Sequence, residues 1–296
     1  MIIQNLENAA LDLLQKNITT SLEAHGVAIL PPLEVKDSVD LVRQLGFHPI
    51  VTMLDPWYNK GFGGVRADYK EFVLDLLQLS AVVSDHVFLW GFPEIVAYFV
   101  DKLPAELSLV AWLTWYYKNN PSVIRGWRSA QNACLHLARN GAKLYPEHFL
   151  NEAQKQKLAE GKLRYIPGPT SVIEASLLVG FVGKKEQTGH PAQKPVTVFE
   201  TLYLMTTQKG DLVFDPMSGS GTTGAAVQKL GRHAILSDCS EEYTQIMEKR
   251  LGIRRVSAEH LFTMAVTPLD RAEHGEHGEN GSFRNQEGES LQLKFL

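Results

Sequence analysis

Apolar residues recur along the chain with two different spacings, and each spacing predicts a different kind of element. Residues 2–24 carry apolar side chains at the helical period, which predicts an N-terminal helix packed on the domain. Short apolar runs predict buried strands at 26–30, 50–54, 85–90, 107–117, 132–138, 211–214 and 234–237. Helices are predicted at 38–45, 68–79, 93–102, 152–161, 196–207, 225–230 and 240–251. This alternation is typical of an α/β fold with a mostly parallel sheet and helices on both faces.

Two segments are less regular. The run 107–117 holds four aromatic residues, which fit a core strand or a surface stacking platform, and the core strand is favoured. Residues 140–189 show no simple period apart from a Lys-rich helical patch. From Pro268 onward the Gly-, His-, Glu- and Asn-rich composition predicts a disordered tail, in which His274 and His277 are not expected to bind a metal.

Composition and charge narrow the class of protein. A length of 296 residues with 44% hydrophobic side chains predicts one large domain. The net charge of −4 argues weakly against a nucleic-acid binder, but six acidic and three basic residues lie beyond Leu261, so the body is nearly neutral. Two cysteines exclude a disulfide framework or a Cys-rich metal site. The sequence shows no membrane-spanning run or signal pattern, which predicts a cytoplasmic protein.

The stretch with the clearest chemistry is a glycine-rich turn between the strand at 211–214 and the helix that follows it. Its glycines let the backbone approach a ligand closely, and the helix start offers unpaired N–H donors. Asp238 follows Gly219 after 19 residues, as the acid of a dinucleotide fingerprint does. This pattern alone fits NAD, FAD or S-adenosylmethionine equally well.

The position of the turn in the sequence distinguishes between these possible ligands. A dinucleotide fingerprint normally opens its domain, and several strands follow it. Only 72 residues follow Gly224, so the other strands must lie upstream. A cofactor half that comes last predicts a circularly permuted methyltransferase with a Rossmann-like sheet.

Three motifs carry a resemblance to one family, the permuted beta class of bacterial DNA amino-methyltransferases. The turn resembles its cofactor motif, although the family usually has Phe where Met217 stands; its residues are Asp215, Pro216, Met217, Ser218, Gly219, Ser220, Gly221, Thr222 and Thr223. Residues 190–195 match the family's His-Pro-Thr-Gln-Lys-Pro motif at five of six positions. Residues 55–58 resemble its catalytic Asp-Pro-Pro-Tyr, with Trp57 in place of the second proline. The resemblance spans about residues 30–253.

The resemblance implies S-adenosylmethionine as cofactor, DNA as substrate and a flipped base as methyl acceptor. Asp55 and the carbonyl of Pro56 would accept hydrogen bonds from the exocyclic amine, Tyr58 would stack on the base, and Trp57 would line the same pocket. The alternative for Asp55 and Pro56 is a plain turn at a strand end. An acid in this position favours adenine N6 over cytosine N4 by resemblance.

On the cofactor side, the resemblance places Asp215 at the methionine ammonium, Asp238 at the ribose hydroxyls and Lys194 near the methionine carboxylate. His190 and Gln193 belong to the same cofactor motif. The alternatives are that Asp215 only caps the turn, that Lys194 is a surface charge, and that Asp238 is the N-cap of the next helix. Family members often end the strand beside the adenine in an acid, where this chain has two prolines at 31 and 32.

Contacts with nucleic acid are predicted at Lys60, Arg125, Arg128, Lys184 and Lys185. Arg125 and Arg128 flank Trp127, a combination that suits phosphate contact with stacking, and a solvated loop is the equal alternative.

The predicted organisation is a methyltransferase domain over 1–267 and a tail over 268–296. Within the domain we expect a catalytic half at 26–139, a small recognition insertion at about 140–189 and a cofactor half at 190–253. The resemblance also allows a homodimer and a partner restriction nuclease. The functional alternatives are cytosine-N4 methylation, RNA methylation, a catalytically silent binding protein and, more weakly, a nicotinamide dehydrogenase.

Overall fold

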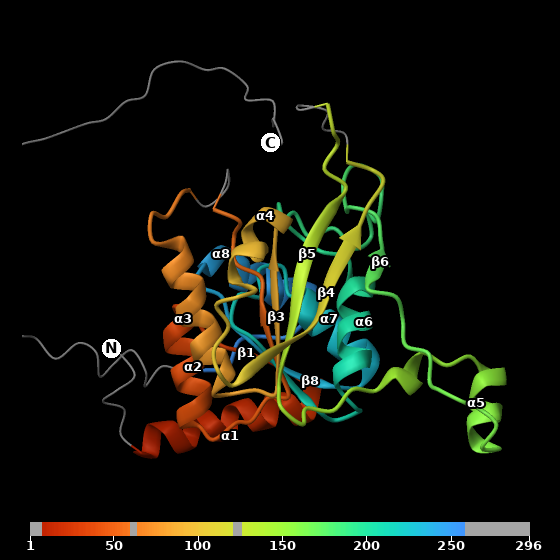
Figure 1. Ribbon diagram of the computed structural model, residues 1–296. Coiled ribbons are helices and arrows are strands. Elements are labelled where there is room, and N and C mark those ends of the chain that lie inside the picture. The colour runs from red at the N-terminus through yellow and green to blue at the C-terminus, as the bar shows by residue number, and fades with distance from the viewer. Residues whose placement is uncertain (1–7, 60–63, 121–125, 258–296) are drawn as a thin grey trace, which may run out of the picture.

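The computed structural model describes residues 8–59, 64–120 and 126–257, and its centre is one eight-stranded sheet (Figure 1). In chain order the strands are β1 (Val27–Ile29), β2 (Val51–Leu54), β3 (His86–Gly91), β4 (Leu107–Tyr116), β5 (Gln131–Arg139), β6 (Val172–Glu174), β7 (Leu212–Asp215) and β8 (His233–Leu236). Across the sheet they lie in the order β1-β8-β7-β2-β3-β5-β4-β6.

The sheet is mostly parallel, as the sequence predicts. Strands β1, β8, β7, β2 and β3 pair in parallel with their neighbours, β5 is antiparallel to β3 and β4, and β6 is parallel to β4. The last two strands of the chain, β7 and β8, lie between the first two, β1 and β2. Segments from both ends of the sequence therefore meet in the middle of the sheet. The circular permutation relative to other methyltransferases stays a prediction.

Helices cover both faces of the sheet. In chain order the helical elements are α1 (Asn8–His25), α2 (Val35–Gln44), α3 (Tyr69–Ala81), α4 (Pro93–Val96), η2 (Ala97–Phe99), η3 (Pro146–Phe149), α5 (Glu152–Ala159), α6 (Val196–Thr206), α7 (Thr222–Leu230) and α8 (Glu241–Leu251). Helices α1 to α4 contribute to one apolar cluster, and α6 to α8 contribute to another. Within the described ranges no helix is both long and apolar enough to cross a membrane.

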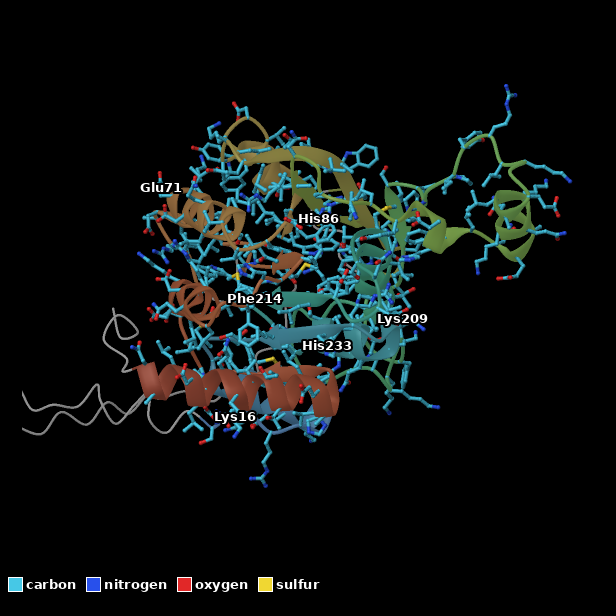
Figure 2. The ribbon with its side chains drawn as sticks, turned by 90° about the horizontal axis from the view of Figure 1, so that it is seen from below. Lys16, Glu71, His86, Lys209, Phe214 and His233 are labelled. Carbon is cyan, nitrogen blue, oxygen red and sulfur yellow. The ribbon has the colours of Figure 1, made fainter. Side chains whose placement is uncertain are left out.

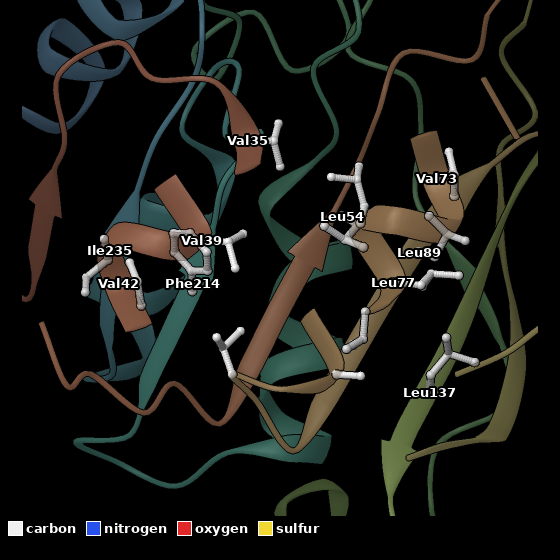
Figure 3. Packing of buried hydrophobic residues seen from close by; sticks show 14 of the residues in the cluster. Val35, Val39, Val42, Leu54, Val73, Leu77, Leu89, Leu137, Phe214 and Ile235 are labelled. Carbon is white, nitrogen blue, oxygen red and sulfur yellow. The ribbon is translucent and has the colours of Figure 1, made fainter. Parts of the chain in front are cut away.

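Successive residues of the central strands feed the two clusters alternately. In β7, Val213 belongs to the cluster under α6 to α8. Phe214 belongs to the cluster under α1 to α4, part of which Figure 3 shows. In β8, Ala234 and Ile235 divide in the same way. Because side chains of a strand point to opposite faces in turn, a strand buried on both faces reads as a continuous apolar run. This burial explains why the sequence pattern identified the central strands so directly.

The structure departs from the predicted elements in the second half of the sheet. In place of the single helix predicted at 93–102, the structure has α4 followed by the short 3₁₀ helix η2. The sequence pattern did not predict η3 or β6. In β4 the aromatic residues divide: Trp115 is 2% exposed in the core, whereas Trp112 is 36% exposed. The indole Nε1 of Trp115 donates to the carbonyl of Ala175 at 2.7 Å, which holds the segment after β6 against β4.

The segment predicted as a recognition insertion contains η3, α5 and β6. Helix α5 stands away from the body (Figure 1), and none of its residues is buried. Its N-terminal end is stabilised locally, because Asn151 and Gln154 form a reciprocal capping box. The boundaries predicted for the domain and its insertion stay a prediction, and the predicted tail at 268–296 lies outside the described residues.

Two buried histidines connect β3 to β5. The His86 Nε2–H donates to the carbonyl of Lys143 at 3.0 Å, so His86 Nδ1 accepts from His136 Nε2 at 3.1 Å. Figure 2 shows His86 and Phe214 in the interior, with Lys16 and Glu71 on outer helices. Burial, together with the neighbouring His86, lowers the pKa of His136 to about 3. Burial also lowers the pKa of His86. Both imidazoles are therefore neutral in the folded protein.

This pair predicts a loss of stability in mild acid. The unfolded chain takes up protons at both histidines near their ordinary pKa of about 6.5, whereas the folded chain does not. The stability is fully present above that pH and declines below it, by up to about 1.4 kcal/mol per pH unit for each histidine. Urea unfolding at pH 7.5, 6.5 and 5.5 measures this decline. His136→Phe should flatten it, whereas His25→Gln, at an exposed histidine, should not.

Candidate active site

The site forms where β2 and β7 separate at the middle of the sheet. Their ladder pairs Val51 with Val213 and Thr52 with Phe214 and then stops. The ladders to the outer neighbours run further, since β2 pairs with β3 up to Leu54 and β7 with β8 up to Asp215. The two strands thus diverge at their carboxyl ends, which is where open α/β sheets bind ligands. Asp55 follows β2 and Asp215 ends β7, so the two predicted motifs meet at the same edge of the sheet.

The predicted cofactor turn connects β7 to α7 with two residues in left-handed backbone conformations. Gly219 has φ +49° and Gly221 has φ +75°. A Cβ at Gly219 would lie 2.9 Å from His190 Nε2, so a larger residue would push the turn and the 190–195 segment apart. Thr222 is the first residue of α7, which begins three residues before the helix predicted at 225–230. The turn therefore combines close backbone approach with a free helix start.

Asp215 is held inside the turn. Its carboxylate accepts from the backbone N–H of Met217 at 3.1 Å and from the hydroxyl of Thr223. Since that hydroxyl donates to Asp215, Tyr203 donates to Thr223 Oγ1 at 2.7 Å. Burial raises the pKa of Asp215 to about 7, and the hydrogen bonds from Thr223 and Met217 oppose that rise. The capping role is thus present in the structure, and contact with the methionine ammonium stays a prediction.

Asp238 ties the end of β8 to the same turn. One carboxylate oxygen accepts from the N–H of Gly219 at 2.9 Å, and the other accepts from the N–H of Ser240 at 2.9 Å. Burial raises the pKa of Asp238. The N-cap of α8 is Ser240, whose Oγ accepts from the N–H of Tyr243, so the alternative of Asp238 as that N-cap is wrong. Its predicted contact with the ribose hydroxyls stays a prediction.

The 190–195 segment lies across the turn. The His190 ring packs edge-on against Tyr243, with centroids 4.4 Å apart, and burial lowers its pKa to about 4. The side chain of Gln193 accepts from Thr188 and donates to the carbonyl of Glu186 at 2.7 Å, and its contact with the cofactor stays a prediction. Gln193 stabilises the loop that precedes the segment.

Lys194 is buried rather than exposed at the surface. Its side chain is 3% exposed and its ammonium forms an ion pair with Asp55. Its backbone carbonyl accepts from the hydroxyl of Thr222 at 3.1 Å. The surface alternative is therefore wrong. The predicted contact of Lys194 with the methionine carboxylate stays a prediction, and the contact that the structure shows is with Asp55.

The two aromatic residues of the predicted catalytic motif, Tyr58 and Trp57, lie in different surroundings. Tyr58 OH donates to Asp55 Oδ1 at 3.3 Å, and its ring packs against Phe92 with centroids 4.7 Å apart. Burial and the Asp55 charge raise the pKa of Tyr58 well above its ordinary value, so the phenol keeps its proton. Trp57 instead packs against Tyr69 and Phe72 on the apolar cluster of α1 to α4. We expected Trp57 in the base pocket; the structure directs its ring into this packing.

The predicted nucleic-acid contacts are only partly described. Lys60 and Arg125 lie outside the described residues. Arg128, Lys184 and Lys185 are exposed, and Trp127 beside Arg128 is 90% exposed. β4 ends, and β5 begins, at the sheet edge that carries Asp55, because β4 runs in the same direction as β3 and β2. An exposed aromatic ring next to a cation at this edge fits the predicted phosphate contact with stacking.

Sequence reasoning missed Arg250 and Glu186. Arg250, on α8, donates from one guanidinium nitrogen to Ser220 and to Thr222, at 3.0–3.2 Å. Its other nitrogen pairs with Glu186 at 3.4 Å, and Glu186 also accepts from the N–H of Val196 at 2.8 Å. These contacts join α8, the cofactor turn and the start of α6. No motif marks either residue, because both act by tertiary contact alone.

No cluster of metal ligands accompanies this site. Across 8–59, 64–120 and 126–257 the structure contains no group of three His, Cys, Asp or Glu side chains that could hold a metal ion. His274 and His277 lie outside those ranges.

The fold and the site define a Rossmann-like methyltransferase, and solved structures share this architecture. The complex of M1.HpyAVI with S-adenosylmethionine aligns with a TM-score of 0.60 over 77% of this chain and all of that one, at 21% identity. The cytosine-N4-specific PvuII DNA methyltransferase aligns with a TM-score of 0.56 over 80% of this chain and 90% of that one, at 16% identity. At these identities the comparisons show the fold.

The family follows from the sequence match. The model of the DNA methylase family N6_N4_Mtase matches residues 76–249, and the chain belongs to this family of S-adenosylmethionine-dependent DNA amino-methyltransferases. The Type II methyltransferase M.HpaI of Haemophilus parainfluenzae is 25% identical over 245 residues, covering 77% of this chain and 72% of that protein. The Type II methyltransferase M2.DpnII of Streptococcus pneumoniae is 47% identical over 145 residues, and the match spans about half of each protein.

Replacing Asp238 tests whether its carboxylate contacts the cofactor ribose or only supports the cofactor turn. Asp238→Ala should raise the dissociation constant for S-adenosylmethionine by about 10- to 100-fold, the scale of losing charge-assisted hydrogen bonds of about 1.5–3 kcal/mol. Calorimetry measures this change. Wild type should also bind an analogue without ribose hydroxyls more weakly, and Asp238→Ala should bind both ligands alike. If the variant still discriminates between them, Asp238 only supports the turn.

Proposed function

We propose that this chain methylates adenine at N6 in DNA, on a base flipped out of the duplex, with Asp55 as the hydrogen-bond acceptor for the amine. The observation that supports this assignment best is that Asp55 and the cofactor turn follow neighbouring parallel strands at one edge of the sheet, with Lys194 in contact with both. The acid at this position supports adenine rather than cytosine, by resemblance to the family's motif.

The residues around the turn suit S-adenosylmethionine. That cofactor carries an ammonium and two ribose hydroxyls, and the turn is flanked by two buried carboxylates, Asp215 and Asp238. The hydroxyl of Ser237, beside Asp238, is buried without a partner among the described residues, which leaves one more polar group at this edge. When bound, the cofactor supplies an electrophilic methyl group on a sulfonium.

The protein's own contribution is to present the amine. The lone pair of an exocyclic amine is delocalised into the ring, and acceptors on both N–H groups favour the pyramidal, nucleophilic form. Asp55 supplies one acceptor, and the carbonyl of Pro56, aimed by a fixed φ, supplies the other. Positive charge develops on the nitrogen as the methyl moves, so an acceptor here helps most in the transition state. Tyr58, supported by Phe92, offers a ring face to the base.

Asp55 is the residue whose removal should stop the reaction. Asp55→Ala should lower kcat by at least about 100-fold, the scale of losing one preorganised transition-state contact, and leave the cofactor dissociation constant within a few-fold. Methyl transfer from labelled cofactor, with mass spectrometry of the bases, measures rate and product together. Asp68→Ala, at an exposed aspartate paired with Arg66, is the matched control. Near-normal turnover in Asp55→Ala would contradict the assignment, and N4-methylcytosine as product would redirect it.

Phosphate contacts should be few, because the body of the chain is nearly neutral. Arg128→Ala should weaken binding to all duplex sequences alike and make the slope of log affinity against log salt shallower by about 0.9, the value for one phosphate. Lys209→Ala is the control, because Lys209 precedes β7 at the opposite edge of the sheet. An unchanged slope would assign Arg128 to a solvated loop, and preference for single strands would favour unpaired DNA or RNA as substrate.

The relatives are described as Type II methyltransferases, which supports a restriction nuclease as functional partner. A homodimer is a proposal from the family resemblance alone, and light scattering of the purified chain tests it.

A further inference from the structure

Lys194 lies where the catalytic and cofactor parts of the site meet. Its ammonium forms an ion pair with Asp55 at the end of β2, and its backbone carbonyl accepts from Thr222 at the start of α7. Pro195, directly after it, is the N-cap of α6. One residue is therefore anchored to the catalytic acid, to the cofactor turn and to a core helix.

Aromatic rings confine the ammonium of Lys194. Its Nζ lies 5.3 Å from the ring centroid of Tyr58 and 5.2 Å from that of Trp90. The Trp90 ring is itself fixed, since its Nε1 donates to Met53 Sδ at 3.2 Å. A desolvated ammonium over ring faces is stabilised by cation–π attraction but still needs a hydrogen-bond acceptor. Among the described residues Asp55 supplies it.

The pair fixes the orientation of Asp55. One carboxylate oxygen accepts from Tyr58 OH and the other accepts from Lys194. A carboxylate held at both oxygens cannot rotate freely about its side-chain bond, so its remaining lone pairs point in set directions. Such orientation matters to the reaction rate, because a misplacement of about 1 Å can cost about 100-fold.

We propose that Lys194 is the positioning residue for Asp55, and that this role, rather than charge pairing with the cofactor carboxylate, is its main contribution to the rate. The inference rests on the proposed function of Asp55. It goes further because it gives the lysine of the cofactor motif a role in orienting Asp55, and because Lys194 connects the cofactor turn to Asp55.

The two roles of Lys194 predict different kinetics. A ligand of the cofactor carboxylate contributes to binding, so its loss raises the cofactor dissociation constant and KM while kcat at saturating cofactor is kept. A positioning residue for Asp55 contributes to the chemical step, so its loss lowers kcat at saturating cofactor. Calorimetry with S-adenosylmethionine alone reports binding without turnover and separates the two roles.

The test compares Lys194→Met and Lys194→Gln with wild type. Lys194→Met should lower kcat at saturating cofactor by about 10- to 100-fold while the dissociation constant changes by less than about threefold. Lys194→Gln keeps a donor and should recover part of the loss. Lys229→Met removes a lysine that pairs with Glu200 on the surface and should leave both quantities unchanged. If Lys194→Met does not fold, the same comparison is made with Lys194→Gln.

A double variant shows whether the lysine acts through the acid. In an Asp55→Asn background, Lys194→Met should lower kcat little further, because the group it positions is already altered. Additive losses, or an unchanged kcat with a dissociation constant raised tenfold or more, would overturn the inference. These outcomes differ from failure of the proposed function, in which the Asp55 variants themselves stay active.

Discussion

The site depends on one constraint, the parallel pairing of β2 with β7 at the centre of the sheet. Because both strands run the same way, the residues that follow them emerge at the same edge. The ladder between them ends two residues before the β2–β3 ladder and one residue before the β7–β8 ladder, so the two strands part at that edge. Asp55 and Asp215 are distant in sequence, and this pairing alone brings them to the two sides of one space.

Buried polar groups then fix the conformation of the cofactor turn between β7 and α7. The carboxylates of Asp215 and Asp238 are satisfied largely by backbone N–H groups and hydroxyls of the cofactor turn. Unpaired buried acceptors are costly, so these bonds specify one conformation of a glycine-rich segment that would otherwise have many. Arg250 adds a cation that holds the outer side of the same turn through Ser220 and Thr222. The turn is thus rigid even though its residues are small.

The ion pair of Lys194 with Asp55 links this rigid turn to the acceptor side. Structurally it explains why the lysine of the 190–195 segment is buried, which surface-charge reasoning does not. Trp57 takes no part in this pair and packs on Tyr69 and Phe72. The motif's orientation comes from Tyr58 and Lys194, and the residue between Pro56 and Tyr58 is free to serve the core.

The sequence by itself determined the central strands, the cofactor turn and the family resemblance, because these depend on local patterns. Val213 and Phe214 serve opposite faces of a buried strand and so read as an apolar run, and glycines at 219 and 221 meet a backbone requirement that few other residues can. The helix predicted at 240–251 is likewise present as α8, with Ser240 as its N-cap. What only the tertiary structure decided are the partners of side chains across the sheet. The direction of Trp57, the contacts of Arg250 and Glu186, and the pairing of Lys194 with Asp55 depend on which strands become neighbours, and no local spacing encodes that choice.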